Sequence, residues 1–320
     1  MRLVAKAIAL SIFISFLAVR LAAADTGHGI TISPVQKEII ISSGLVEATT
    51  NVELTNHTGK NLVGTIRLVD FKTLDETGGL LFSQAGVPSD KYGLANWMTL
   101  PNGEVVNVQN GQTTTIPVAI SNRADLAPGG HYGAVIVTLG TSQQPGSTQA
   151  SFKQELVSLL LVKKRGGEDY GLLLQSFSAN TKNNIPSTVN LGFRAGGNVH
   201  VVPRGYVTVT DPKGKMVAKG IINTQSTVLL PGTSRRLVTI LEPIANSGVS
   251  GKYKVTAYYR YDDQGEFSRQ SIYVTRLTWS LPLVVLAIIT GMGGLLFINR
   301  LIRKKKKFVN RSSTVHPRYK

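Results

Sequence analysis

The sequence contains no cysteine among its 320 residues. Disulfides, cysteine metal ligands and cysteine nucleophiles are therefore all excluded. The fold must be stabilised by core packing alone. This is feasible because about 250 residues, divided into domains of ordinary size, bury enough apolar surface.

Motifs for metal binding and catalysis are also missing. The histidines form no close pair with the spacing of a metal site; they are His28, His57, His131, His200 and His316. The sequence has no G-x-S-x-G, H-E-x-x-H or P-loop pattern. We therefore predict no catalytic residue, no metal, no cofactor and a protein that is not an enzyme.

Acidic residues are scarce, at 18 against 35 basic ones, which gives a formal net charge of +17. Three basic residues lie in 1–24 and nine in 300–320, whereas every acidic residue lies between these two segments. Basic residues at the chain's ends are typical of membrane-topology signals. We therefore predict no nucleic-acid partner.

The N-terminus has the three parts of a signal peptide. A basic start, Met1–Lys6, precedes an apolar run, Ala7–Val19, and then the small residues Ala22–Ala24. We predict a signal peptide over residues 1–24, cleaved after Ala24. An uncleaved membrane anchor is the alternative.

A second apolar run, Trp279–Ile298, contains no charged residue. A helix of about 20 residues spans roughly 30 Å, the thickness of a bilayer core. We predict a transmembrane helix over 279–298, with Trp279 at the outer interface and a basic cytoplasmic tail over 299–320. The predicted cytoplasmic interface residues are Arg300, Arg303 and Lys304. The prediction is a single-pass type I protein of the cell membrane; a buried core helix is the alternative.

Between these two segments the sequence pattern predicts an all-β structure. Short runs rich in Val, Ile and Thr alternate with Gly, Pro, Asn and Asp; they are 30–32, 38–42, 50–55, 62–69, 113–120 and 134–139. Turn signals at intervals of about ten residues are typical of a β-sandwich.

An internal repeat divides this region into two. Gly111 is followed by Tyr132 after 21 residues, and Gly232 is followed by Tyr253 after the same interval. Equal spacing at two places indicates two domains of one type. We predict domains over 25–165 and 166–276, with the boundary in the charged Gly-Gly segment 163–171.

The residues around each repeated tyrosine carry a resemblance. Leu126-Ala127-Pro128-Gly129-Gly130-His131-Tyr132 has the form L-x-P-G-x-x-Y, which resembles the tyrosine corner of immunoglobulin-like and fibronectin-like sandwiches. In that motif the tyrosine hydroxyl bonds to backbone just upstream. The resemblance implies structural roles for Tyr132 and Tyr253, with a binding role as the alternative. Together with the apolar run 279–298, the resemblance predicts an all-β fold class of two tandem immunoglobulin-like β-sandwiches plus one C-terminal transmembrane α-helix.

The opening stretch, Ile30–Gly59, resembles the first strands of the pilus-chaperone-like branch of that fold. The stretches 92–120 and 126–135 resemble bacterial surface proteins of the WxL-interacting type. Those proteins carry a signal peptide, a peptidoglycan-binding domain, a second domain that contacts a host partner, one transmembrane helix and a basic tail. The resemblance implies a cell-envelope protein whose partner is peptidoglycan, another wall polymer or a surface protein.

The first repeat is about 16 residues longer than the second, and the extra residues fall within 70–97. Long loops on rigid sandwiches often carry function. We therefore predict a ligand-binding site at Phe82, Tyr92 and Trp97. The alternative is that Tyr92 and Trp97 close the end of the sandwich.

Together these features predict a membrane-anchored extracytoplasmic protein for binding, adhesion or envelope scaffolding. Its partners are the lipid bilayer and a wall polymer or surface protein; the oligomeric state stays open. One alternative is a tethered subunit of an export or assembly machine. Another is an envelope enzyme with a site assembled between the domains.

Overall fold

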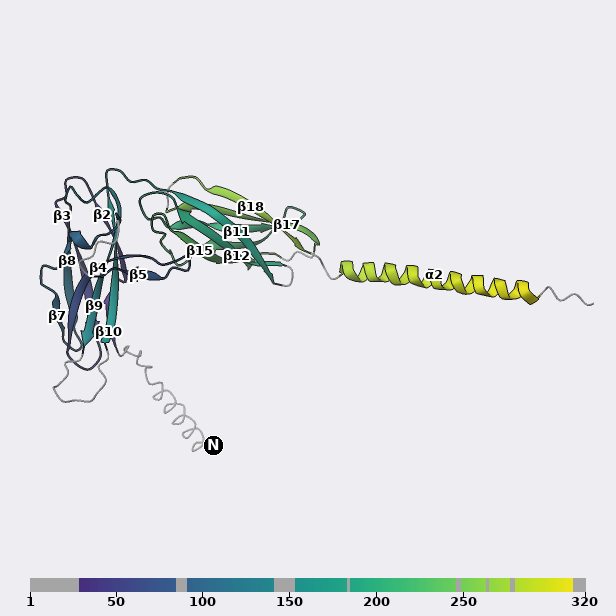
Figure 1. The fold of residues 1–320 in the computed structure, drawn as a ribbon, viewed down its shortest axis with the longest axis horizontal. Helices are drawn as coiled ribbons and strands as arrows, with labels where there is room; N and C mark the ends of the chain where they lie inside the picture. Colours follow the sequence, from purple (N-terminus) through teal and green to yellow (C-terminus); the bar gives the residue numbers. More distant parts are fainter. Residues whose placement is uncertain are drawn as a thin grey trace, which may run out of the picture. The chain divides into compact units, whose positions relative to one another are not determined.

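The computed structural model describes residues 29–84, 91–140, 153–182, 185–245, 249–262, 265–276 and 280–312 (Figure 1). Within these ranges the chain is all-β up to residue 276 and continues in one C-terminal helix. This confirms the predicted fold class. The contact pattern separates two compact units. The first comprises residues 1–171, 195–201 and 229–235, and the second comprises 172–194, 202–228 and 236–320. Because the units interleave along the chain, the domain ranges predicted from the sequence remain proposals.

The first unit contains a sandwich of two sheets. One sheet has the strand order β1 (Ile30–Ser33), β3 (Glu47–Asn56), β8 (Thr113–Ser121), β6 (Met98–Thr99). The other has the order β2 (Gln36–Ile41), β10 (Lys153–Lys164), β9 (Gly129–Gly140), β4 (Leu62–Thr73), β5 (Leu80–Phe82), and β7 (Val105–Val108) also pairs with β4.

Alternating side chains explain why these segments form a sandwich. In β3 buried and exposed residues alternate along the strand, and Val52 and Leu54 are fully buried. Val135 and Val137 of β9 face the same core from the second sheet. Successive side chains of a strand point to opposite faces, so this pattern buries one face of each sheet.

β10 has a different neighbour on each side. Along its whole length it pairs antiparallel with β9. On the other side it pairs parallel with β2, but only from Leu159 to Lys164. Residues 153–158 therefore have one paired and one open side among the described strands.

The second sandwich also has two sheets. One has the order β11 (Leu172–Lys182), β12 (Ile185–Ala195), β15 (Ser234–Ile240). The other has the order β16 (Glu242–Pro243), β14 (Met216–Ile222), β13 (Pro203–Thr210), β17 (Gly251–Tyr261), β18 (Ser268–Arg276). Val207, Val209 and Val255 are fully buried on the inner face of this second sheet.

The C-terminal helix, α2, runs from Ser280 to Ser312 and so continues beyond the apolar run into the basic residues. Its stretch Leu283–Arg303 has a mean hydropathy of 1.9. By length and composition this is the one described helix able to cross a membrane.

Candidate functional site

The insertion predicted within 70–97 folds onto the first sandwich. It contains β5, which pairs with the end of β4, and a short 3-10 helix, η1 (Ala95–Trp97). The buried carboxylate of Asp70 accepts hydrogen bonds from the backbone N–H groups of Leu94 and Ala95, both at 2.6 Å. These bonds satisfy donors at the start of η1, which lack partners within the helix. One carboxylate thus fixes the returning segment to the sheet.

The insertion brings two predicted ligand-binding residues to Tyr132. The ring of Phe82 lies 6.4 Å from that of Phe71, which lies 6.1 Å from the ring of Tyr132. The ring of Tyr92 lies 6.3 Å from Tyr132, and the Tyr92 carbonyl accepts the Tyr132 N–H at 2.8 Å. These four rings, which we call the aromatic cluster, lie on the outer face of the sheet that contains β9. Their edge and tilted contacts are typical of packed aromatic groups.

Trp97 is placed apart from the aromatic cluster. Its ring lies 6.0 Å from that of His131, and its Nε1–H donates to Asp125 at 3.2 Å. The His131 ring nitrogens contact the carbonyls of Gly93 and Ala127 at 3.2 Å and 2.7 Å. Tyr92 and Trp97 are half-buried against their own fold. Their predicted role in ligand binding stays a prediction.

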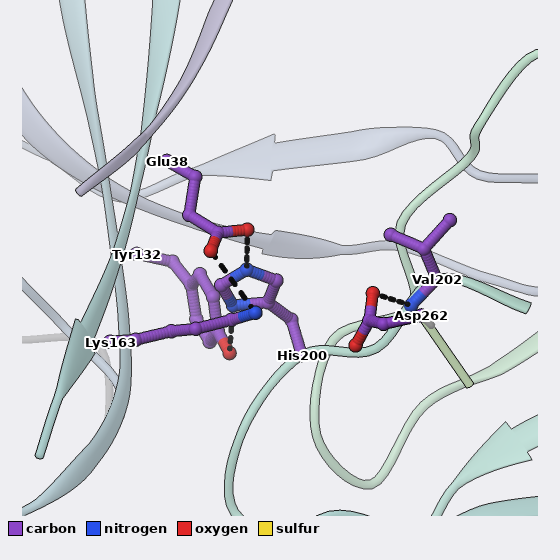
Figure 2. A network of polar contacts seen from close by, with 6 residues as sticks. All are labelled: Glu38, Tyr132, Lys163, His200, Val202 and Asp262. Atoms are coloured by element: carbon purple, nitrogen blue, oxygen red, sulfur yellow. Dashed lines mark hydrogen bonds and ion pairs between the residues drawn. The ribbon is translucent and has the colours of Figure 1, made fainter. Parts of the chain in front are cut away.

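Tyr132 of the aromatic cluster also belongs to a polar network (Figure 2). Tyr132 Oη lies 3.3 Å from Nδ1 of His200, and Nε2 of His200 lies 3.1 Å from Oε2 of Glu38. The other carboxylate oxygen of Glu38 lies 3.1 Å from Nζ of Lys163. The network joins β2, β9 and β10 to residues 195–201, which belong to the same compact unit.

The protonation states in the network follow from its geometry. The Glu38 carboxylate only accepts hydrogen bonds, so Nε2 of His200 carries a proton. In a neutral ring Nδ1 is then unprotonated and accepts a hydrogen bond from the Tyr132 hydroxyl. The His200 side chain is 1 % exposed, Lys163 is 13 % exposed and Glu38 is 44 % exposed. One end of the network therefore faces solvent.

Two pKa shifts characterise this network. The hydrogen bond from His200, together with the hydrogen bond and charge of Lys163, lowers the pKa of Glu38 from 4.5 to about 2, although partial burial acts in the opposite direction. Burial raises the pKa of Tyr132 far above its usual value. The phenol therefore stays protonated and acts as a hydrogen-bond donor. Such an arrangement suits a structural clamp between strands.

The two predicted tyrosine corners differ. The Tyr253 hydroxyl donates to the carbonyl of Val249 at 2.7 Å, four residues upstream. The Tyr132 hydroxyl instead contacts the His200 side chain, so the expected bond to upstream backbone is replaced by a bond to a histidine distant in sequence. A Cβ at Gly130 would lie 2.1 Å from the Tyr132 hydroxyl oxygen, so Gly130 leaves the space that this tyrosine needs.

The predicted membrane-interface residues lie on or beside α2. Arg300 and Arg303 are exposed on the helix. Lys304 belongs to the helix, but its side chain lies outside the described residues, and so does Trp279. Among the described residues, no group of three or more His, Asp or Glu side chains is placed to hold a metal ion.

Sequence reasoning missed Glu38, Lys163 and His200 as a group. Each carries a weak local signal: a charged residue beginning a strand, a lysine in the supposed domain boundary, and an isolated histidine. Glu38 and His200 are 162 positions apart, so no spacing pattern connects them.

No protein-family model matches the sequence, and the search of curated proteins gave no match. Solved structures do resemble the chain. A chaperone–tip adhesin complex of CFA/I fimbriae aligns at 11% identity over 78% of this chain and 100% of that chain, with a TM-score of 0.42. The Class 5 fimbriae chaperone CfaA aligns at 12% identity over the same shares, with a TM-score of 0.42. The CsuC–CsuE chaperone–tip subunit complex of Acinetobacter baumannii aligns at 12% identity over 65% of this chain and 88% of that chain, with a TM-score of 0.33.

At these identities the likeness concerns the fold alone. The neighbours have pilus-chaperone-like folds of the immunoglobulin-like kind. The resemblance to WxL-interacting proteins has no counterpart among them and stays a prediction.

Proposed function

We propose that this chain is a single-pass membrane protein whose sandwiches lie outside the cytoplasm and bind a partner protein of the cell surface. In this proposal an extended segment of the partner adds as a strand to the open side of residues 153–158 in β10. One observation carries the proposal. β10 pairs with β9 from Lys153 onward, but it pairs with β2 only from Leu159 onward.

The backbone direction of β10 supports strand addition. The Leu159 N–H donates to the carbonyl of Val35 at 2.8 Å, so the backbone polar groups of Leu159 point away from β9. In an antiparallel pair these groups alternate in direction from residue to residue. Those of Glu155 and Val157 therefore point to the same open side. An unpaired row of N–H and C=O groups is the template that strand-adding ligands use.

The same half-strand is held in place by contacts within its own sandwich. Leu156 packs against the core, and Ser158 is fully buried with its hydroxyl bonded to the Pro34 carbonyl at 2.6 Å. Glu155 forms an ion pair with Arg67 at 3.0 Å. A rigid edge loses little conformational freedom on binding, which favours affinity.

The apolar stretch of α2 supports the membrane part of the proposal, because its length fits a bilayer core. Export by the N-terminal segment and the type I orientation are parts of the same proposal. The solved chaperones described above include complexes with a tip adhesin. For this chain, binding to a surface protein rests on the β10 edge.

Site-specific photo-cross-linking in intact cells tests the proposal. A benzophenone amino acid replaces Val157, and a control replaces Thr49, an exposed residue of β3 in the same sandwich. The proposal predicts a discrete protein adduct from position 157 and none from position 49. Mass spectrometry should map the adduct to an extended segment of the partner.

Other adducts would contradict this proposal. Glycan adducts at position 157 would favour a wall polymer as the partner. Adducts with components of a secretion channel would favour the export-machine alternative. Equal labelling from positions 157 and 49 would show that the β10 edge is not a specific site.

A further inference from the structure

We propose that the end of the second sandwich from which α2 leaves binds the anionic lipid headgroups of the membrane that α2 crosses. This inference rests on the membrane anchoring in the proposed function. It concerns one surface, which we call the basic end: Lys213, Lys215, Lys252, Lys254 and Arg276.

Strand register gathers these residues at one end. Gly251 pairs with Arg276 and Lys252 pairs with Thr275, so β17 begins where β18 ends. Lys254 pairs with Thr210, the last residue of β13. The turn 211–215 that follows β13 therefore lies at the same end. The chain leaves this end at Arg276 to enter the helix.

The turn that carries two of the lysines has a fixed geometry. The Asp211 carboxylate accepts the backbone N–H groups of Lys213 and Lys215, both at 2.9 Å. The Asp211 N–H donates to the Lys215 carbonyl at 2.9 Å, and Gly214 takes a positive φ of 84°. Both lysine side chains are exposed and so extend into solvent from a defined turn.

In the described segments that form the basic end, 210–215, 249–254 and 273–276, Asp211 is the one acidic residue of the sequence. Asp211 is 7 % exposed and already bonded to backbone. The adjoining segments 246–250 and 277–279 contain no acidic residue in the sequence. The Arg276 guanidinium lies 5.8 Å from the Tyr253 ring and donates to its hydroxyl at 3.1 Å, which holds this cation in place. Like charges gathered in one place repel one another unless an anionic surface lies nearby.

The chain itself keeps this surface close to the membrane. Three residues, 277–279, separate Arg276 from the start of α2 at Ser280. Even fully extended, they span no more than about 14 Å. Electrostatic attraction extends over roughly 8–10 Å at ordinary ionic strength. Tyr273, which is 65 % exposed opposite Lys254, adds an aromatic group of the kind that favours the headgroup region.

Reconstituted full-length protein tests the inference. Because the chain has no cysteine, a single fluorophore can be placed at Thr275→Cys, and a control fluorophore at Ser268→Cys near the start of β18. Quenching by headgroup-attached nitroxides is measured in neutral vesicles and in vesicles with about 30 mol% phosphatidylglycerol. We expect quenching at position 275 to rise at least about 2-fold with the anionic lipid, and to return to the neutral value in about 0.5 M NaCl. Position 268 should not respond.

Charge variants assign the effect to the basic end. Replacing the four lysines, Lys213→Gln, Lys215→Gln, Lys252→Gln and Lys254→Gln, should abolish the response to phosphatidylglycerol. A matched control removes four exposed cations elsewhere in the sandwich, Arg194→Gln, Lys219→Gln, Arg236→Gln and Arg269→Gln, and should keep it. Equal behaviour of the two variants would overturn the inference.

Extraction with alkaline carbonate separates this inference from the anchoring on which it rests. If the chain resists extraction but quenching ignores the anionic lipid, the inference fails while the anchoring stands. If carbonate releases the chain, both fail. Competition by soluble poly(glycerol phosphate) without any response to lipid would also overturn the inference and would favour a wall polymer.

Discussion

At the scale of single residues, the unusual feature is the network of Glu38, Lys163, His200 and Tyr132. Removing one member of a buried polar network leaves its partners without their hydrogen bonds. Glu38 is the most exposed member of the network, and its pKa is lowered to about 2, so its carboxylate loses its charge only in strong acid. His200 and Lys163 are mostly shielded from water, and their hydrogen bonds to Glu38 are stabilised by the carboxylate charge.

Glu38→Gln should change the acid stability of the first sandwich. The folded pKa of about 2 lies below the usual 4.5, so the ionised carboxylate stabilises the fold above about pH 4.5, and this contribution is lost as the pH falls towards 2. Because Glu38 is partly exposed, we expect only about 1 kcal/mol at pH 7. The difference between native protein and variant should shrink towards zero near pH 2. Urea unfolding measures it from Trp97 fluorescence in a Trp279→Phe background, since the chain has two tryptophans. A difference that grows as the pH falls would contradict this account.

Gly130→Ala should destabilise the first sandwich through the Tyr132 hydroxyl. The new Cβ would lie 2.1 Å from that oxygen and 2.9 Å from the ring carbon that bears it. Tyr132→Phe alone should cost about 1 kcal/mol for the lost hydrogen bond. In the double variant the phenylalanine should relieve part of the clash. The double variant should therefore lose less unfolding free energy than the two single variants lose in total. A double-mutant cycle of unfolding free energies tests this, and simple additivity would contradict it.

At the scale of elements, the strands were predictable and the insertion only in part. β3 follows from the alternation of buried and exposed residues, and β9 from a short continuous apolar run; turn residues bound both, so these local signals need no distant partner. The extra length of the first repeat located the insertion. Its attachment was not predictable, because Asp70 meets Leu94 across 24 positions and nothing in the local pattern marks that aspartate. The polar network escaped sequence reasoning for the same reason.

Asp70→Ala should loosen the insertion. It would leave the N–H groups of Leu94 and Ala95 without their carboxylate in a buried site, at a cost of about 2–3 kcal/mol. Hydrogen exchange of the amides in 92–97 should speed up relative to those of β3. Asp75→Ala is the matched control, because the Asp75 carboxylate bonds Thr77 in an exposed turn. Similar exchange in the two variants would refute the anchoring role of Asp70.

At the scale of the whole molecule, two β-sandwiches precede a helix of transmembrane length. The apolar helix was predictable from the sequence, because about 20 consecutive residues without charge indicate a transmembrane helix without reference to any distant residue. The orientation across the membrane is a separate prediction, based on the basic residues that follow the run.

Cysteine accessibility tests that orientation. In intact cells a membrane-impermeant thiol reagent should modify Thr275→Cys but leave Ser312→Cys unmodified until the cells are opened. The native chain is a blank because it has no cysteine. Labelling of position 312 from outside would reverse the proposed topology.

The central claim, strand addition at the open side of β10, is tested most directly by the affinity of Val157→Pro for the segment that cross-links to position 157. Proline removes the N–H that points to the open side and leaves the ladder to β9 complete. We predict at least about 10-fold weaker binding, with Val157→Thr within about 3-fold of the native chain because it keeps the N–H. A folded Val157→Pro variant that binds the segment as tightly as the native chain would contradict the account.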